Sequence, residues 1–339
     1  MKNKAITMQD IARISGYSKT SVSFAFNNPD KIGKKATEEI LAVAREYDYS
    51  PNPLARNLSL GRLNTIGFLL PQAITETLSN PYIIDVIRGL GSVCQANNNS
   101  LTIIPPLNDS LKDAVLDATV DAIATMGYSI NNEIEIALRT RKIPSIMIDG
   151  YKQNSIPSIN IDDKKAAYEQ MKYALEHKHK EIAIISLNEP HFTSEDSDSI
   201  VQKRLNGYKM ALSEYEDIKV QYYSCHTTKE EGSALAEHIF SNGNNPTCII
   251  TMADIVAIGI MQALDKLNIK VPGQVSIIGF DNIIEGEYMK PSLTTVSQPG
   301  YKKGVAAAEY LFSALKKNEA DKSFEIETKI IERESFKGL

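Results

Sequence analysis

The chain opens with Thr7-Met8-Gln9-Asp10-Ile11-Ala12 and, after Ser15-Gly16-Tyr17, continues with Ser18-Lys19-Thr20-Ser21-Val22-Ser23-Phe24-Ala25-Phe26. Thr7 and Ser18 each stand where a hydroxyl can cap the first turn of a helix, and Asp10 suits the positive end of the first one. Two short helices joined by a tight turn that contains Gly form the helix-turn-helix pattern, whose second helix enters the major groove of DNA. This stretch therefore predicts a DNA-reading head.

A third helix of the head is predicted over residues 34–47, where apolar residues recur at helical spacing. The three helices would share a small core, which we expect to consist of Ile11, Val22, Ile40, Leu41 and Ala44. So small a core makes the head only marginally stable alone.

The charge of the chain is unevenly distributed. Residues 1–62 carry ten Lys or Arg against six Asp or Glu, although the whole chain has 37 basic and 42 acidic residues and a formal net charge of −5. A basic head on an acidic body is expected when only the head contacts DNA phosphates.

Residues 51–61 predict a hinge helix. Pro53 suits the first turn of a helix, since its missing N–H is not needed there, and Gly61 ends the apolar pattern. A helix of about eight residues is marginal in water without packing. We expect it to fold when two copies pair over DNA.

From Asn64 onward, short apolar runs alternate with segments of helical periodicity. The runs are 66–71, 101–104, 122–126, 145–148, 182–185, 248–251 and 275–280, and the helical segments include 82–97, 164–177, 204–214, 230–241 and 254–267. Buried strands that alternate with helices predict an α/β body of parallel sheets. Two sheets of about six strands fit the count, with a ligand cleft between two lobes, beyond the carboxyl ends of the strands.

Several classes of protein are disfavoured by what the sequence lacks. It has no apolar run approaching the roughly 18 residues that span a membrane, and its N-terminus lacks a signal-peptide segment, so we expect a cytoplasmic protein. Cys94, Cys225 and Cys248 are few and far apart, which favours buried thiols over disulfides or a metal site. Walker A, GxGxxG, GxSxG and HExxH motifs are absent, and the five His residues show no metal spacing. We therefore expect no enzyme, no cofactor and no metal.

Head, hinge and body together resemble the lactose/galactose repressor family of bacterial transcription regulators over nearly the whole chain. The resemblance is carried by motifs in a fixed order: Ile11-Ala12, Ser18-Lys19-Thr20-Ser21-Val22-Ser23, Asn27-Asn28-Pro29, Tyr49-Ser50-Pro51-Asn52, Ala55-Arg56-Asn57-Leu58, Asn80-Pro81-Tyr82, Arg88-Gly89, Arg204-Leu205-Asn206-Gly207-Tyr208, Val271-Pro272, Gly279-Phe280-Asp281 and Pro291-Ser292-Leu293-Thr294-Thr295-Val296. It implies a homodimeric repressor that binds a near-palindromic operator and responds to a small, sugar-like effector.

By this resemblance, Lys19, Thr20 and Phe24 read bases, whereas the DNA-backbone contacts are Ser18, Ser21, Ser23 and Asn27. Many relatives have Arg or His where this chain has Phe24, which cannot make a bidentate guanine contact. Phe24 either packs on a thymine methyl or turns back into the head. In the hinge, the resemblance assigns minor-groove contacts to Ala55, Arg56 and Leu58, with Leu58 as a wedge between base pairs. Packing of Leu58 on the body is the alternative.

Effector contacts map by the resemblance onto Tyr82, Arg204, Asp254 and Asp281, with Asp149 and Asp162 as weaker candidates. A stacking Tyr beside Asp and Arg hydrogen-bonding groups suits a polyhydroxylated ligand. Capping remains open for Asp254 and Asp281, a surface ion pair for Arg204 and simple packing for Tyr82.

The chain departs from its relatives at Lys178-His179, at Ala253 before Asp254, and in the acidic loop 193–199, which is either a reshaped cleft mouth or a solvated loop. We expect a head at 1–50, a hinge at 51–61 and a body at 62–339. Within the body, the N-lobe comprises about 62–163 plus 297–322, and the C-lobe about 164–296 plus 323–339. Two alternatives stay open, namely a periplasmic-type sugar receptor without DNA function and a regulator controlled by a protein corepressor.

Overall fold

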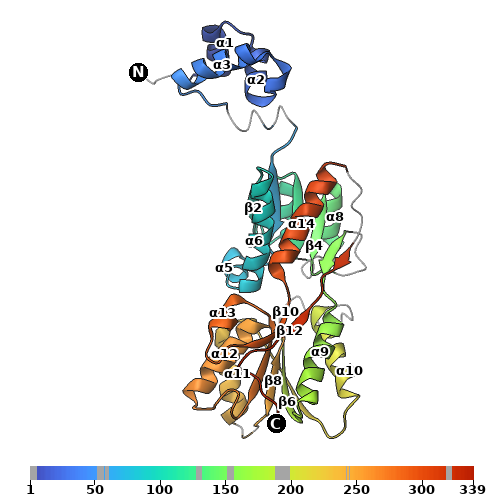
Figure 1. The fold of residues 1–339 in the computed structure, drawn as a ribbon. Coiled ribbons are helices and arrows are strands. Elements are labelled where there is room, and N and C mark those ends of the chain that lie inside the picture. Colours follow the sequence, from blue (N-terminus) through green and yellow to red (C-terminus); the bar gives the residue numbers. More distant parts are fainter. Residues whose placement is uncertain are drawn as a thin grey trace. The chain divides into compact units, whose positions relative to one another are not determined.

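The computed structural model describes residues 6–51, 57, 61–126, 132–150, 156–187, 199–241, 243, 245–317 and 323–339. It divides into two compact units, Met1–Asn64 and Thr65–Leu339. Figure 1 shows the elements of both units. Among the described residues, no helix is long and apolar enough to cross a membrane.

The described part of the first unit, up to residue 51, is a head of three α-helices. It contains α1 (Met8–Ser15), α2 (Lys19–Asn27), the 3₁₀ turn η1 (Pro29–Lys31) and α3 (Lys34–Glu46). Thr7 and Asp10 form a reciprocal capping box at the start of α1, and Gly16 ends this helix in the left-handed conformation. Ser18 caps α2 by accepting from the backbone N–H of Ser21. The predicted helix-turn-helix therefore forms for the local reasons given above.

The core of the head is small, as expected. Its buried residues are Ile11, Ala12, Val22, Ala25 and Ile40, and Ala44 is buried as well. Leu41 differs from the prediction because it is only half-buried.

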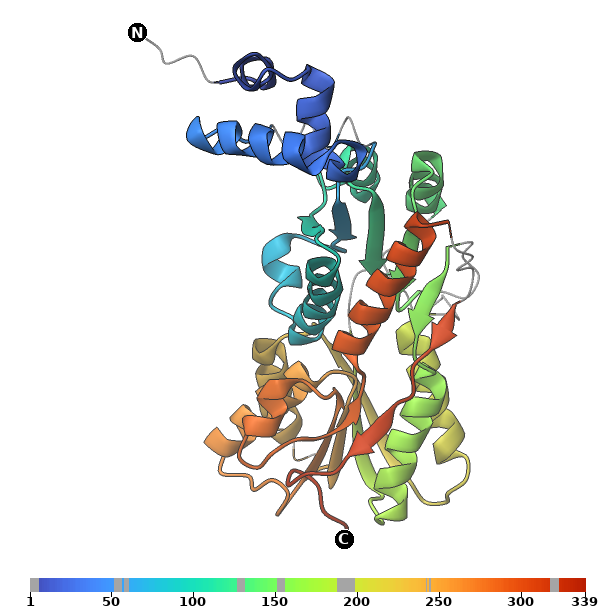
Figure 2. The same ribbon diagram turned by 45° about the horizontal axis from the view of Figure 1, so that its top comes forward.

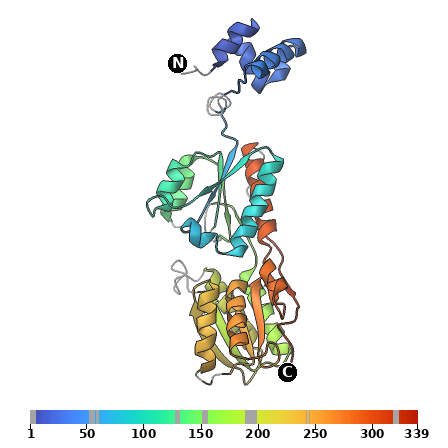
Figure 3. The ribbon, with the colours of Figure 1, turned by 90° about the vertical axis from the view of Figure 1, so that its left-hand side faces the viewer.

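The second unit has two lobes, each built on a six-stranded sheet flanked by helices (Figure 3). The N-lobe sheet has the order β11-β5-β4-β3-β1-β2, with strands β1 (Thr65–Leu69), β2 (Ser100–Ile104), β3 (Ala122–Met126), β4 (Ser145–Ile148), β5 (Ser158–Asn160) and β11 (Phe324–Glu325). Its helices are α5 (Ile74–Thr77), α6 (Pro81–Ala96), α7 (Leu111–Asp117), α8 (Asn132–Arg141) and α14 (Gly300–Leu315). All strand pairs in this sheet are parallel.

The C-lobe sheet has the order β12-β10-β9-β8-β6-β7, with strands β6 (Glu181–Leu187), β7 (Lys219–Cys225), β8 (Cys248–Thr251), β9 (Ser276–Asp281), β10 (Thr294–Ser297) and β12 (Lys329–Ile331). Its helices are α9 (Asp163–Glu176), α10 (Ile200–Leu212), α11 (Lys229–Ser241), α12 (Asp254–Lys266) and α13 (Ile284–Tyr288). Only β12 runs antiparallel to its neighbour, β10. The predicted α/β class with two mostly parallel sheets is confirmed.

The chain passes between the lobes three times, before α9, before α14, and between β11 and β12 (Figure 2). The last passage corrects the predicted lobe boundary. Phe324 and Glu325 pair with β5 of the N-lobe sheet, so the C-terminal segment of the C-lobe begins after residue 325 rather than at 323. Two residues at the edge of a sheet give too short a pattern to be detected in the sequence.

Helices α6 and α14 of the N-lobe pack with their backbones unusually close. A Cβ added at Gly89 would overlap the carbonyl oxygen of Tyr301, and one added at Gly304 would overlap that of Val86. The two glycines therefore let the helices approach closely, and this approach fixes the start of α14 beside Tyr82.

Candidate functional site

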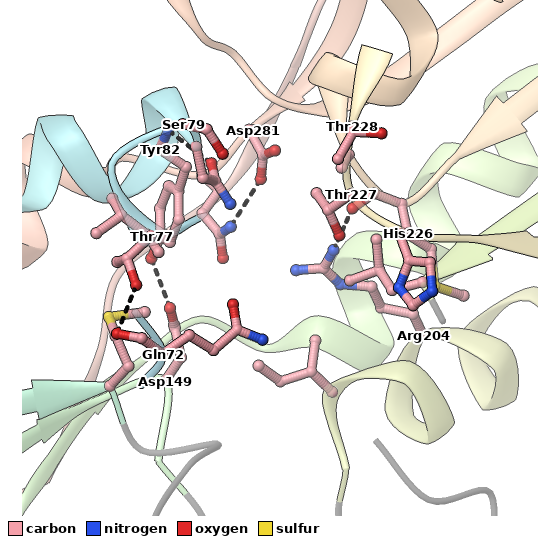
Figure 4. Close-up of a pocket in the computed structure, with 18 residues that line it drawn as sticks. Gln72, Thr77, Ser79, Tyr82, Asp149, Arg204, His226, Thr227, Thr228 and Asp281 are labelled. Atoms are coloured by element: carbon pink, nitrogen blue, oxygen red, sulfur yellow. Dashed lines mark hydrogen bonds between the residues drawn. The ribbon is translucent and has the colours of Figure 1, made fainter. Parts of the chain in front are cut away.

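A cavity of about 410 Å³ lies between the two lobes of the body (Figure 4). Its lining includes residues at or just after the carboxyl ends of strands in both sheets, namely Gln72, Met126, Asp149, Leu187, His226, Met252 and Asp281. This is where parallel α/β sheets place their ligands. The predicted cleft position thus coincides with a real cavity.

On the N-lobe side, Tyr82 and Asp149 line the cavity together. Tyr82 is held at the start of α6, where the side chain of Asn80 caps the helix by accepting from the Tyr82 N–H at 3.0 Å. The Tyr82 hydroxyl donates to Asp149 Oδ2 at 2.5 Å. Both side chains are buried, so the positions of the phenol and the carboxylate are fixed by each other.

Behind these two residues lies Lys303, which has no exposed surface at all. Its ammonium forms an ion pair with Asp149 and also donates to Tyr82 Oη at 3.0 Å and to Gln298 Oε1 at 2.9 Å. A buried charge is tolerated only when it is paired and hydrogen-bonded, as here.

Gln298 connects this group to the C-lobe. Its Nε2 donates to Asp281 Oδ1 at 2.9 Å, while its Oε1 accepts from Lys303. Gln298 follows β10 directly and lies in the second passage between the lobes. One side-chain amide therefore joins Lys303 of the N-lobe to Asp281 of the C-lobe.

Asp281 lies close to a second carboxylate, that of Asp254. Burial raises the pKa of Asp281, and the negative charge of Asp254 raises it further. Burial also raises the pKa of Asp254, although hydrogen bonds from Thr295 and the N–H of Ile283 act in the opposite direction. The two carboxyl groups therefore hold protons to a higher pH than isolated ones would.

Arg204 is the cavity-lining cation of the C-lobe. It comes from α10 and is almost completely buried. Its Nε donates to Asp163 Oδ1 at 2.9 Å, and one terminal nitrogen donates to the carbonyl oxygen of Met252 at 2.7 Å. The guanidinium also stacks on the ring of Phe280 at 3.6 Å. These contacts fix its plane, and its remaining N–H groups are the ones available to a ligand.

The structure therefore brings together four of the six predicted effector residues, Tyr82, Asp149, Arg204 and Asp281, around one cavity. Their binding of an effector stays a prediction. Ala253, noted above as a departure, also lines the cavity and offers it only a methyl group.

The other two predicted effector residues are placed elsewhere. Asp254 is fully buried outside the cavity lining, and its carboxylate accepts from Thr295 Oγ1 at 2.6 Å and from the Ile283 N–H at 3.0 Å. Asp162 is exposed and caps α9 by accepting from the Lys165 N–H at 3.0 Å. Neither side chain lines the cavity, because each one serves its local surroundings, and their binding of an effector stays a prediction.

Sequence reasoning missed Gln298 and Lys303, together with the rim of the cavity that His226, Thr227 and Thr228 form at the start of α11. A polar Gln and Lys beside a helical start carry no distinctive pattern. Lys303 lies 154 residues from its partner Asp149, so only the fold reveals the pair.

In the head, Lys19 and Thr20 are exposed in the first turn of α2, where a recognition helix presents its base-reading side chains. Phe24 is half-buried, with the Nζ of Lys31 5.5 Å from its ring centroid. The ring is not part of the buried core of the head. Part of its surface thus remains available for an apolar contact.

The predicted DNA-backbone residues also have internal roles. Ser18 caps α2 and its hydroxyl lies 2.9 Å from that of Ser21, while Asn27 Nδ2 donates to Ser23 Oγ at 3.3 Å. Capping and phosphate contact are compatible at a helix N-terminus, and phosphate contact stays a prediction for these side chains.

Two predicted features lie outside the described residues. These are the hinge contacts Ala55, Arg56 and Leu58, and most of the acidic loop 193–199. Ser199, its last residue, is buried and caps α10.

His179, the other departure noted above, is structural. It is buried, with Nδ1 3.0 Å from Thr247 Oγ1 and Nε2 2.9 Å from the carbonyl oxygen of Lys337, and burial lowers its pKa. Cys94, Cys225 and Cys248 are buried free thiols, as expected. Within the described part of the chain, no group of three or more His, Cys, Asp or Glu side chains is arranged to hold a metal ion.

Comparison with known proteins agrees with this division of the molecule. Residues 7–52 match the family model described as bacterial regulatory proteins, lacI family, and residues 171–336 match that of a periplasmic binding protein-like domain. The probable HTH-type transcriptional repressor ExuR of Bacillus subtilis is 31% identical over 347 residues, which cover 98% of this chain and 99% of the relative.

Two solved structures show the same fold. The Lac repressor dimer bound to operator and the anti-inducer ONPF superposes with a TM-score of 0.82 at 19% identity, covering 98% of this chain and 99% of the other. A LacI family transcriptional regulator from Enterococcus faecium, solved with bound ribose, has a TM-score of 0.70 at 23% identity, covering 81% of this chain and 99% of the other.

Proposed function

The chain belongs to the lacI family of bacterial regulatory proteins and is a DNA-binding transcriptional repressor with an effector-binding body, and we propose that its effector is a sugar or sugar derivative bound between the two lobes. Its relatives are transcriptional regulators, and the chain is a regulator rather than an enzyme. The match of residues 7–52 to a DNA-binding family model also sets aside a receptor without DNA function.

The observation that carries the proposal is the chemistry of the cavity lining. Ile83, Met126, Ile200 and Met252 supply apolar surface, and the ring of Tyr82 supplies an aromatic face. Arg204 and Asp281 add hydrogen-bonding groups whose positions are fixed from behind. A sugar presents apolar C–H faces and a ring of hydroxyls, so it matches both parts of this surface. The ribose bound to the Enterococcus faecium regulator supports this choice.

We place DNA reading on the head. Lys19, Thr20 and Phe24 would contact base edges from α2, while Ser18, Ser21, Ser23 and Asn27 would fix the helix on the phosphates. Two heads of a homodimer would read the two halves of a near-palindromic operator, as the two-fold symmetry of such sites requires. The hinge contacts Ala55, Arg56 and Leu58 would add a minor-groove contact. A repressor of this kind acts where its operator lies, in the cytoplasm.

Effector and operator would be coupled through the arrangement of the lobes. A ligand held by Tyr82 and Asp149 of one lobe and by Arg204 and Asp281 of the other favours one lobe arrangement over another. Only such a difference in affinity can shift the equilibrium between DNA-binding states. Control by a protein corepressor on the body is the second candidate, and a ligand-filled cavity would make it unnecessary.

A thermal-shift screen of the full chain tests the effector class. Ribose, other pentoses, hexoses and disaccharides would form one arm, and nucleobases and nucleosides the other. We expect a saturating sugar to raise the melting temperature of the body, since a ligand that binds only the folded state stabilises it by mass action. Stabilisation by nucleobases alone would contradict the proposal.

A further inference from the structure

The charges around the cavity are arranged in the same way in both lobes. Each lobe contributes to the lining one member of a buried ion pair, Asp149 in the N-lobe and Arg204 in the C-lobe. Each is paired with an opposite charge that does not belong to the lining, Lys303 behind Asp149 and Asp163 behind Arg204. All four side chains are buried.

The ammonium of Lys303 has no capacity left for a ligand. A lysine has three N–H donors, and those of Lys303 go to Asp149, Tyr82 and Gln298. Its effect on the cavity is therefore indirect. It cancels the charge of Asp149 without offering a donor of its own.

Arg204 retains donors, but its charge is cancelled as well. The Nε–Oδ1 distance to Asp163 is 2.9 Å, and both side chains are less than a tenth exposed. Arg204 can therefore donate hydrogen bonds to an effector, yet it provides no unpaired positive charge for one.

Two further titratable groups line the cavity. Burial and the adjacent Asp254 raise the pKa of Asp281, and its carboxyl group adds no positive charge whether or not it holds a proton. His226 is exposed at the rim, where water screens it. Among the described lining residues, a buried anionic effector would thus meet no uncompensated cation and one carboxyl group.

We propose that the effector of this site is an uncharged, polyhydroxylated molecule, and that Lys303 sets this preference by neutralising Asp149 from behind the cavity wall. The inference rests on the proposed function and narrows it to neutral sugars, excluding uronic acids and sugar phosphates. Burying an unpaired charge is strongly unfavourable, whereas hydroxyls can exchange their hydrogen bonds with water for those of Arg204, Asp281 and Tyr82.

The test uses matched ligand pairs on the full chain. Galactose with galacturonate, glucose with glucuronate, and ribose with ribose 5-phosphate are titrated by calorimetry after a thermal-shift screen. In the parent chain we expect each neutral member to bind more tightly than its charged partner. Tighter binding of any charged member than of its neutral partner overturns the inference but leaves the proposed function standing. If no member of any pair binds, the proposed sugar effector is contradicted, and so is the inference that rests on it.

Variants of Asp149 and Lys303 test whether this ion pair causes the preference for uncharged ligands. Asp149→Asn leaves the Lys303 charge uncancelled, so the affinity for the acid relative to its neutral partner should rise at least tenfold. Lys303→Met leaves Asp149 uncancelled and should shift relative affinity at least tenfold toward the cationic glucosamine over glucose. The double variant removes both charges and should return both ratios to within about threefold of the parent values.

A matched control removes the same charge elsewhere. Glu181→Gln breaks an exposed pair with Lys219, whose N–O distance is 3.0 Å, at a site outside the cavity. It should leave both ratios unchanged. If Lys303 and Asp149 had a purely structural role, replacing them would weaken the binding of neutral and charged ligands equally. Unchanged affinity ratios in single variants that still bind the neutral sugar would therefore overturn the inference.

Discussion

Gln298 and Asp281 are joined by a hydrogen bond of 2.9 Å from Nε2 to Oδ1. The same amide accepts from Lys303, which belongs to α14 of the N-lobe, whereas Asp281 ends β9 of the C-lobe. The bond therefore spans the passage between the lobes, next to the cavity. Loss of this bond should weaken the binding of any ligand that contacts both lobes.

We expect Gln298→Ala to weaken effector binding by about tenfold or more, because Lys303 and Asp281 lose their hydrogen bonds and their fixed directions. Titration calorimetry with a sugar found in the screen measures this. Gln274→Ala is the control, since Gln274 bonds the backbone of Lys270 at an exposed site away from the cavity. Equal effects of the two variants would contradict the role given to Gln298.

The fold could largely be predicted from the sequence because its elements are locally encoded. The capping residues Thr7 and Ser18 and the apolar runs at 122–126 and 248–251 each specify one helix or strand without reference to distant residues. The alternation of such elements then limits the topology to parallel sheets.

The site was less predictable because its contacts are distant in sequence. Asp149, Lys303 and Tyr82 meet only after the lobes have folded, and no spacing rule links them. Asp254 and Asp281 both lie at strand ends or helix starts, yet only the structure shows that Asp254 turns inward to Thr295 while Asp281 reaches the cavity.

Close packing of α6 against α14 gives a stability prediction. Gly89→Ala should destabilise the body by roughly 1–3 kcal/mol, since the new methyl group would overlap the backbone of Tyr301. Gly91→Ala, in the same helix, places its Cβ 3.8 Å from Leu101 Cδ2, an ordinary contact. This control should be neutral or stabilising by up to about 1 kcal/mol, because Ala favours helix over Gly. Denaturant unfolding distinguishes the two, and similar losses in both would contradict the packing described.

Asp281 predicts a pH dependence of stability. Its pKa is raised in the folded state, so the folded protein binds more protons than the unfolded one above the ordinary carboxyl pKa. The contribution of Asp281 to stability is complete below that pKa and is lost as pH rises through the raised value.

The comparison of parent and Asp281→Asn unfolding free energies over roughly pH 5 to 8 isolates this effect. The parent should lose stability relative to the variant as pH rises. The opposite trend expected from the lowered pKa of His179 is present in both chains and cancels. A difference that is constant with pH would show that Asp281 is not perturbed.

Thr20 provides the test of the head. Thr20→Ala should weaken binding to a DNA fragment selected by the parent chain from a random library by about 1–3 kcal/mol, and it should weaken binding to scrambled DNA much less. Fluorescence anisotropy at fixed salt measures both. Equal losses on the two DNAs would instead make Thr20 a contact to the backbone of DNA.

Coupling between cavity and operator is the central claim, and a paired titration tests it most directly. Operator affinity is measured with and without a saturating sugar, and sugar affinity is measured with and without saturating operator DNA. The account predicts that both affinities change by the same factor, because linkage is reciprocal. A sugar that occupies the cavity while operator affinity stays unchanged would contradict it.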